Sequence, residues 1–351
     1  MSLNINTFSG WPGEPEWMRE LRSRARTEMA GLPWPGRRNE DWERTDIASF
    51  QIENRVLGSA TQETVQAGSP LAGFSGRLVL QGGSVVSVWL KPELAAQGVR
   101  LVSLREAVIG GTATAKPDAL ATVLETVMSG AEVKLPALHA VLVEAGAVLL
   151  IPGNLVVEEP FLLELEETRT NVLASPQLIL WAGRSSQATV VVRRKSAASL
   201  DATVNSAAFA SLDDGAVLNW IDVQEYGTRV EWIDHSRAHL GRDANLFHWN
   251  ACLGGNTVKT SLRVDLNGEG ASLRAHGLYF GVNDQHKDLR IVQNHASPRT
   301  SSNALYKGAV RDRARTVFQG LIEVQPQAFQ TDAYLSNKNL VLTDGARADS
   351  L

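Results

Sequence analysis

The C-terminal half of this chain carries a repeat of nearly constant length and changing sequence. From about residue 185 onwards, a small residue opens a strand-like run every 27 to 29 residues, at Ala188, Ala216, Ala244, Ala271, Thr300 and Ala328. A second series of strand-like runs lies between them, near Ala208, Ser236, Arg263, Ile291 and Gly320. Two interleaved series with one period are typical of stacked β-strands, in which each turn covers the apolar face of the turn before it.

Side chains also alternate within these runs, as a strand with two different faces requires. The even-numbered residues from Val230 to Leu240 are mainly apolar, whereas Glu231, His235, Arg237 and His239 share the odd positions. We expect the even set to point inward and the odd set to meet solvent. A β-sandwich also has regular short strands, but it rarely holds one period over six units. The pattern therefore favours a mainly β protein with a parallel β-helix, or solenoid, core.

The first 130 residues have a different pattern. Trp17, Leu21 and Ala25 recur at helical spacing within a helix expected over Glu16–Met29. Residues 77–90 are typical of a β-hairpin around Gly82-Gly83, and residues 117–129 of a second helix. We therefore divide the chain into a helical or mixed α/β domain over residues 1–131 and a β-helix core over residues 132–351.

Composition limits the compartment and the partners. The 34 basic and 38 acidic residues give a formal charge of −4 without a long basic run, so binding to nucleic acid is not expected. A single cysteine, Cys252, excludes an intrachain disulfide and favours a reducing compartment. The N-terminus does not resemble a signal peptide, and no apolar run approaches the ~20 residues that span a bilayer. We expect a cytoplasmic protein that does not bind membranes.

Metal ligands are sparse in the sequence. His235 and His239 share a strand face, but residues four apart in a strand are separated by about 13 Å, too far for one ion. Both histidines are expected on a solvated face, and Cys252 is expected as a small buried residue. An iron–sulfur site needs about four ligands, mostly thiolates. We therefore expect that no metal or cofactor is bound by this chain alone.

Enzyme motifs are equally sparse. The segment 254–260 superficially resembles a phosphate-binding loop but lacks its Gly-Lys pair, so we expect a turn there. The paired acids Glu158-Glu159 and Asp213-Asp214 are of the kind that a carbohydrate-active β-helix enzyme, such as a lyase, uses. Adjacent acids on a strand point to opposite faces, which favours turn and surface roles. No catalytic residue is assigned, and the lyase-like enzyme remains the alternative function.

Several ordered segments resemble the SufB/SufD family of iron–sulfur cluster assembly proteins. The N-terminal segment Asn39-Glu-Asp-Trp-Glu-Arg-Thr45 is similar to one that is typical of the SufD branch. The other segments form an ordered set near the C-terminus: Asn294-His-Ala-Ser-Pro-Arg-Thr-Ser-Ser302, Tyr306-Lys-Gly308, Ala314-Arg-Thr-Val-Phe-Gln-Gly-Leu-Ile-Glu-Val324, Gln330-Thr-Asp-Ala333 and Asn337-Lys-Asn-Leu-Val-Leu342.

The resemblance implies a right-handed parallel β-helix with an N-terminal helical domain. It also implies a non-catalytic scaffold subunit in a cytosolic complex with a SufB-like subunit and a SufC-like ATPase. Iron or an iron–sulfur cluster would then be held only within that complex. Among the matched segments, His295, Arg299 and Lys307 are the residues expected near a subunit junction.

The sequence departs from the family pattern at its end. Family members continue beyond the Ala346-Arg-Ala-Asp349 region into a segment that contains a cysteine and a histidine, and then into a helical domain that contacts SufC. This sequence ends at Leu351. We therefore expect a scaffold without that reactive edge, whose last turn pairs with another copy to form a homodimer.

Overall fold

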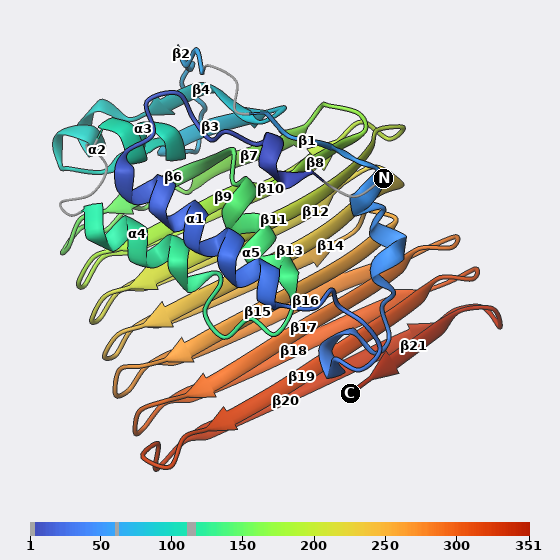
Figure 1. Ribbon diagram of the computed structural model, residues 1–351. Helices are drawn as coiled ribbons and strands as arrows, with labels where there is room; N and C mark the ends of the chain where they lie inside the picture. Colours follow the sequence, from blue (N-terminus) through green and yellow to red (C-terminus); the bar gives the residue numbers. More distant parts are fainter. Residues whose placement is uncertain (1–3, 60–62, 111–116) are drawn as a thin grey trace.

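The computed structural model describes residues 4–59, 63–110 and 117–351, and two stacked parallel sheets dominate it (Figure 1). The chain alternates between the sheets and builds a β-solenoid of about seven turns, which confirms the expected fold class. The first sheet, sheet A, contains β1 (Val56–Leu57), β5 (Arg100–Ser103), β6 (Ala145–Ile151), β8 (Val172–Ala174), β9 (Pro176–Ala182), β11 (Asp201–Leu212), β13 (Arg229–Leu240), β15 (Thr257–Leu266), β17 (His286–His295), β19 (Arg315–Val324) and β21 (Arg347–Ser350).

The second sheet, sheet B, faces sheet A across the core. It contains β2 (Gln66–Ala67), β3 (Gly76–Gln81), β4 (Ser84–Leu90), β7 (Phe161–Glu167), β10 (Gln187–Ser196), β12 (Val217–Glu225), β14 (Asn245–Cys252), β16 (Ser272–Gly281), β18 (Ser301–Val310) and β20 (Asp332–Val341). Within both sheets the solenoid strands pair in parallel.

The inner faces of the two sheets form one continuous apolar core. Val230, Trp232, Ala238 and Leu240 of β13 all belong to it, so the even-numbered residues point inward as expected. Each strand contributes alternate residues to this core because successive side chains of a strand point to opposite faces. Each turn of the solenoid thereby covers the apolar side chains of the turn next to it.

The small residues of the period mark the turns that lead into sheet B. At most of these turns one residue has a positive φ, and the next is small and buried, as in Gly215-Ala216 and Gly270-Ala271. Glycine tolerates that backbone best, but Asp243 and Arg299 adopt it too. The small residue follows directly because the stacked turns leave little room there.

Strand pairing corrects three members of the predicted series. Gln187 pairs with Val217 and Ser301 pairs with Asp332, so the equivalents of Ala216 are Ser186 and Thr331 rather than Ala188 and Ala328. In sheet A, Ser236 pairs with Leu262 rather than Arg263. Spacing alone missed these shifts because the turns differ in length while the paired strands remain in register.

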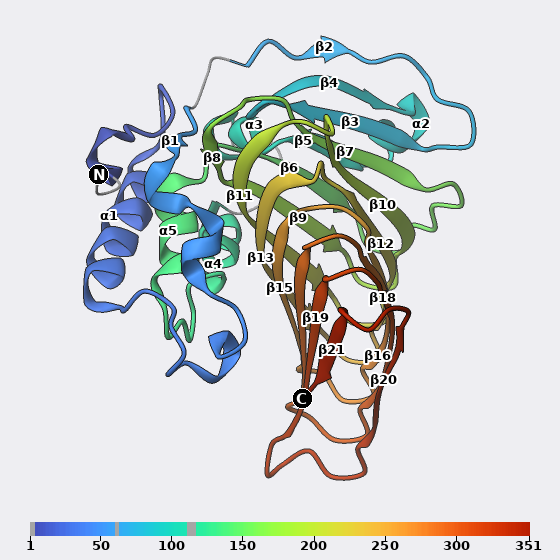
Figure 2. The same ribbon diagram turned by 90° about the vertical axis from the view of Figure 1, so that its right-hand side faces the viewer.

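The helical part of the molecule lies mainly on the outer face of sheet A; its short helix over Pro92–Ala96 instead follows β4 and packs against the inner core through Leu94. It contains α1 (Glu16–Gly31), α2 (Pro92–Ala96), α3 (Leu104–Gly110), α4 (Pro117–Thr126) and α5 (Lys134–Leu142), together with the short 3₁₀ helices η1 (Ile5–Thr7), η2 (Glu40–Trp42), η3 (Ile47–Phe50) and η4 (Ile52–Asn54). Figure 2 shows α1, α4 and α5 beside β11 and β13, with no helix over β10 to β20 of sheet B. Within the described ranges, none of the helices is long and apolar enough to cross a bilayer.

A second apolar core joins these helices to the sheet. Leu21 of α1 and Leu138 of α5 pack in the same cluster as Phe209 and Ile233, which point outward from sheet A. Arg22 of α1 is buried and donates hydrogen bonds to carbonyl oxygens at the C-terminal end of α5, including that of Val141 at 2.7 Å. The helical part is therefore fixed to the solenoid by both apolar and polar contacts.

The N-terminal elements agree with most of the sequence-based expectations. The helix at Glu16 and the antiparallel hairpin of β3 and β4 are present, whereas the helix that starts at Pro117 ends at Thr126 instead of Ser129. Val141 and Leu142 fall within the range 132–351 that was expected to form the β-helix core, but they lie in α5. That helix is buried on nearly all sides, so its sequence has no polar face to reveal the helical period. The division at residue 131 stays a prediction; β3, β4 and β5, which precede it, join the solenoid sheets.

Candidate functional site

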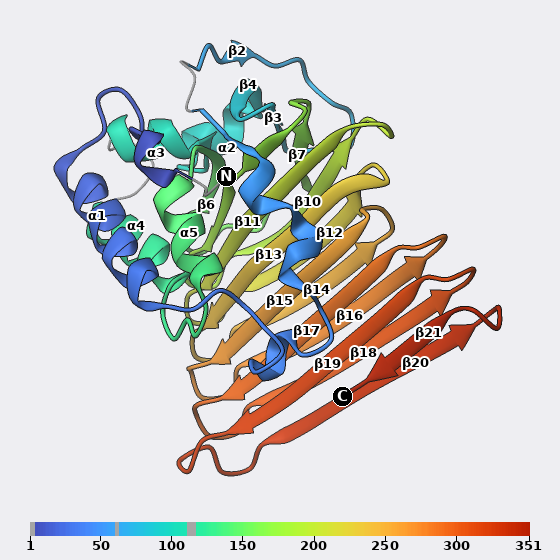
Figure 3. The same cartoon turned by 45° about the vertical axis from the view of Figure 1, so that its right-hand side comes forward.

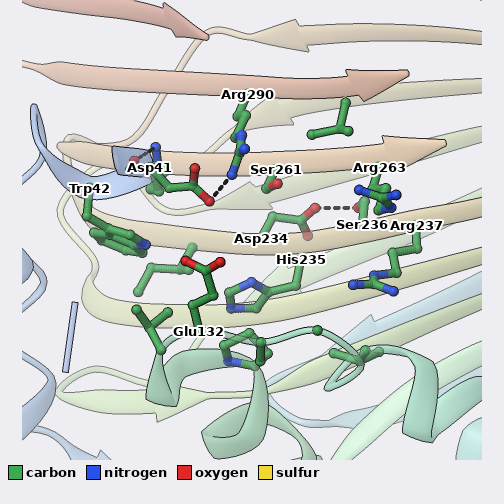
Figure 4. Close-up of a pocket in the computed structure, with 18 of the residues that line it drawn as sticks. Asp41, Trp42, Glu132, Asp234, His235, Ser236, Arg237, Ser261, Arg263 and Arg290 are labelled. Atoms are coloured by element: carbon green, nitrogen blue, oxygen red, sulfur yellow. Dashed lines mark hydrogen bonds and ion pairs between the residues drawn. The ribbon is translucent and has the colours of Figure 1, made fainter. Parts of the chain in front are cut away.

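The main candidate site is a groove on the outer face of sheet A, with a cavity of about 330 Å³. Its floor comes from β13, β15 and β17, one wall from residues 127–136 between and around α4 and α5, and the other wall from residues 39–42. In Figure 4, Asp41 and Trp42 lie at one end of the groove, and Arg237 and Arg263 lie at the other. Three distant parts of the sequence thus meet in one site.

The N-terminal strap (residues 39–54) crosses the sheet below the helices, as Figure 3 shows. Trp42 is buried there, packs edge-on against Phe50 and lies under the ammonium group of Lys259, whose Nζ is 5.6 Å from the ring centroid. The carbonyl oxygen of Asp41 accepts hydrogen bonds from Lys259 and Gln319. The strap therefore contacts two of the last strands of sheet A directly.

A buried ion pair holds the centre of the strap. Lys259 Nζ lies 2.8 Å from Asp288 Oδ2, and Thr45 donates a hydrogen bond to the same carboxylate oxygen. His286 Nε2 lies 2.8 Å from Thr45 Oγ1. Burial lowers the pKa of Lys259, and the neighbouring Asp288 opposes that shift. Burial also lowers the pKa of His286 to about 4, so this ring is neutral near pH 7.

His235 lines the groove as a neutral ring. Its Nε2 lies 3.1 Å from Oδ1 of Asn205, whose Nδ2 donates to the carbonyl oxygen of Leu135. The amide orientation therefore assigns the proton to Nε2 and leaves Nδ1 as an acceptor. Burial, His139 and Arg237 lower the pKa of His235 to about 3. His235 is partly exposed in the groove rather than fully solvated as expected, because residues 127–136 form a wall beside it.

Three of the four cations of the groove have carboxylate partners. Besides the Lys259–Asp288 pair, Arg290 pairs with Asp41, and Arg263 lies 2.9 Å from Glu323. Arg237 instead donates a hydrogen bond to the carbonyl oxygen of Ser129. Burial and the neighbouring Arg263 lower the pKa of Arg237, although Asp265 opposes the shift.

Asp265 lies beside the groove and has three polar partners. It is 3.2 Å from His239 Nε2 and accepts hydrogen bonds from Arg263 and Asn294 at 2.9 and 2.8 Å. Burial alone would raise its pKa, but these hydrogen bonds and the positive charge of Arg263 lower the pKa to about 2. Asp265 is therefore ionised and already occupied.

The three predicted junction residues have different environments in the structure. His295 is buried at the end of β17, with its ring nitrogens 2.8 Å from Thr300 Oγ1 and Ser302 Oγ. Arg299 is exposed in the following turn, has a φ of +54° and pairs with Glu269. Lys307 is exposed on the outer face of sheet B. Their role at a subunit junction stays a prediction.

The remaining sequence candidates have ordinary structural environments. Cys252 is buried in the inner core with Lys287 Nζ at 3.9 Å, and burial raises the pKa of its thiol. The 254–260 segment is a short loop followed by the start of β15, and Asp213 and Asp214 lie at an exposed turn. Across the described parts of the chain, no three His, Cys, Asp or Glu side chains are grouped so that they could hold a metal ion.

Sequence reasoning missed a charged network inside the solenoid. Arg194 donates a bidentate pair of hydrogen bonds to Asp222, with its Nε and Nη2 each 3.0 Å from a carboxylate oxygen. Asp234 accepts a hydrogen bond from Ser206 at 2.6 Å and another from Ser236. Burial opposes ionisation, but Asp222 and Asp234 raise the pKa of Arg194. The sequence contained one indication of this network: Arg194 has the same even-numbered spacing as Val190 and Val192, whose side chains point inward.

The fold and the groove together define a class of protein. It is a two-sheet parallel β-solenoid that carries a helical N-terminal region on one face and offers long sheet surfaces. Residues 165–351 match the family model described as SUF system FeS cluster assembly, SufBD core domain. The chain therefore belongs to the SufBD family of iron–sulfur cluster assembly proteins.

Curated relatives agree with this assignment. The SufBD family protein Rv1462 of Mycobacterium tuberculosis is 38% identical over 147 residues, covering 40% of this chain and 37% of the relative. SufD of Escherichia coli is 34% identical over 122 residues, covering 34% and 29% respectively. SufD of Bacillus subtilis is 25% identical over 359 residues, covering 99% and 80%. In the first two matches the chain spans well under two thirds of the length of the relative.

Proposed function

We propose that this chain is a SufD-like, non-catalytic scaffold subunit of a Suf-type iron–sulfur cluster assembly complex. The observation that carries the proposal is the family match over residues 165–351, which covers nearly all of the solenoid. In this proposal the chain pairs with a SufB-like subunit and a SufC-like ATPase in the cytoplasm. A cluster or iron is held only in the assembled complex.

The side-chain chemistry supports a scaffold role. An iron–sulfur cluster is usually held by about four ligands, mostly thiolates, and the single thiol of this chain is buried. The acid pairs that motivated a lyase-like enzyme lie in a loop and at an exposed turn instead of a common groove. These observations favour assembly chemistry on a partner subunit over a reaction centre on this chain.

The last strand of sheet B offers a surface for the SufB-like partner. β20 pairs with β18 along one edge, and its side chains Leu340 and Val341 are more than half exposed. Apolar side chains exposed together on one strand favour contact with a partner protein. We propose that the SufB-like subunit docks on this strand and that, without this subunit, a second copy of the chain forms a homodimer through the same strand.

Co-purification tests the complex. The chain, expressed from its own gene, should retain the SufB-like and SufC-like proteins of the same organism on an affinity column. Leu340→Asp should reduce retention of the SufB-like protein at least tenfold, whereas Leu278→Asp on the outer face of sheet B should not. A folded chain that retains neither protein contradicts the proposal. Light scattering of the chain alone tests the homodimer, which a strictly monomeric mass would exclude.

A further inference from the structure

We propose that the groove on sheet A binds a small organic oxyanion that also carries an O–H or N–H donor, such as a hydroxy acid or an amino acid. Arg237 is the residue that binds the anionic group. His235 Nδ1 is the acceptor for the donor group. The cavity of about 330 Å³ is at the lower end of the size range of small-molecule sites.

The pairing of charges singles out Arg237. Lys259, Arg263 and Arg290 each have a carboxylate within ion-pair distance, whereas no ion pair joins Arg237 to a carboxylate among the described residues. Asp265 influences Arg237 electrostatically, but its oxygens are engaged by other donors. A guanidinium group has five N–H donors, and the bond to Ser129 uses one of them.

The strand register favours the binding of an anion beside Arg237. Arg237 and Arg263 are direct neighbours on adjacent parallel strands. Like charges opposite each other across strands are destabilising. Glu323 and Asp265 offset the charge of Arg263 by direct contact, whereas Arg237 has only the longer-range attraction of Asp265 and no carboxylate in ion-pair contact among the described residues. An oxyanion bound to Arg237 would supply that contact.

The second half of the ligand follows from His235. Because its Nε2–H points to Asn205, its Nδ1 accepts a hydrogen bond from a ligand hydroxyl or amino group. Arg237 and His235 are two residues apart on one face of β13, which separates their Cα atoms by roughly 7 Å. A small hydroxy or amino acid spans that interval with one hydrogen bond at each end.

The acidic residues of the groove agree with this choice of ligand. Asp41 and Glu323 are already paired with arginines, while Glu40 and Glu132 are exposed. In Figure 4 the carboxylate of Glu132 points towards the ring of His235. A carboxylate on that side favours a donor and disfavours a second negative charge. The groove should therefore prefer a singly charged organic acid to a polyanion.

Calorimetric titration of the isolated chain tests the site. We expect saturable binding of lactate or glycine with a Kd at or below ~10 mM, and at least threefold weaker binding of acetate, which lacks the donor. Arg237→Gln should weaken binding at least tenfold, with Arg237→Lys as the second variant should the glutamine variant unfold. Arg313→Gln, a matched change at a distant exposed turn, should leave binding unchanged.

Each outcome decides part of the proposal. No saturable binding of either acid, or equal binding by the Arg237 variants and the native chain, overturns it. Acetate that binds as tightly as lactate and glycine overturns the role of His235. Because the titration needs no partner protein, a failure here is distinct from a failure of complex formation.

Discussion

The outer faces of the two sheets are built on the same repeat and yet have opposite surroundings. On sheet A, Ile233 points outward and is fully buried beneath the helices, and Lys259 is buried beneath the strap. On sheet B, Leu278 and Phe280 point outward and remain 43% and 36% exposed. Figure 2 shows α1, α4 and α5 on the sheet A side only. The repeat specifies the inner face, whereas the outer face depends on which other segment covers it.

The largest effect on stability is expected from breaking the buried ion pair between Lys259 and Asp288 on the outer face of sheet A. Asp288→Ala leaves Lys259 buried without its carboxylate, which should lower the free energy of unfolding by about 3–5 kcal/mol. Urea denaturation measures this change. The double variant Lys259→Met with Asp288→Leu removes both charges and should recover most of the loss. If the double variant is as unstable as the single one, the unpaired charge is not the cause.

A matched pair of truncations compares the two faces directly. Ile233→Ala on sheet A should cost about 2–4 kcal/mol, because it opens a cavity beneath α5. Leu278→Ala on sheet B should cost less than about 1 kcal/mol, because half-exposed side chains contribute little. Denaturant midpoints of both variants measure the difference. Equal costs would mean that the helices do not bury the outer face of sheet A.

The buried histidines make stability fall in mild acid. An unfolded histidine takes up a proton near pH 6.5, whereas folded His286 does so only at about pH 4. The unfolded state therefore binds more protons between these values, and stability decreases as the pH falls through this window. For His286 alone the loss at pH 5 is about 2 kcal/mol.

Thermal unfolding between pH 7 and pH 5 measures this dependence. His286→Asn should flatten the profile, and His276→Asn on the outer face of sheet B is the matched control. A profile that His276→Asn flattens as much as His286→Asn would contradict the assignment to the covered face.

The smallest effect is expected at a turn that belongs to neither face. Arg299 has a φ of +54°, which costs a non-glycine residue about 1 kcal/mol. Arg299→Gly removes this strain but also increases the conformational entropy of the unfolded chain. The gain in the free energy of unfolding should therefore stay below about 1 kcal/mol. Asp243→Gly at the equivalent turn should gain less, because aspartate tolerates this backbone better. A midpoint lowered by Arg299→Gly would show that its pairing with Glu269 outweighs the strain.

The sequence predicted the solenoid because the inner face repeats. Alternation along β13 correctly assigned Trp232 and Leu240 to the core, and the period located most turns. The same alternation could not assign the outer environment, so His235 was expected on a solvated face although it is only partly exposed, in the groove. The alternation along β10 also indicates that Arg194 points inward, and therefore that a charged group lies inside the core.

The groove could not be predicted from the sequence for a different reason. Trp42 and Thr45 lie in the segment that resembles the SufD branch. Nothing in that segment indicates that these two residues contact Lys259 and Asp288. The contacts of Arg237 depend on the same kind of long-range packing. Local patterns predict strands and turns, whereas a site built from three distant segments depends on how those segments pack.

The strap has a consequence for the order in which the chain folds during its synthesis. Thr45 and Asp288, which it hydrogen-bonds, are 243 residues apart. At about 5–20 residues per second, a ribosome needs more than about ten seconds to make β17 after the strap. During that time Trp42 has no sheet to cover it and is accessible to a chaperone. The strap can therefore dock only late in synthesis, after the strands beneath it have formed.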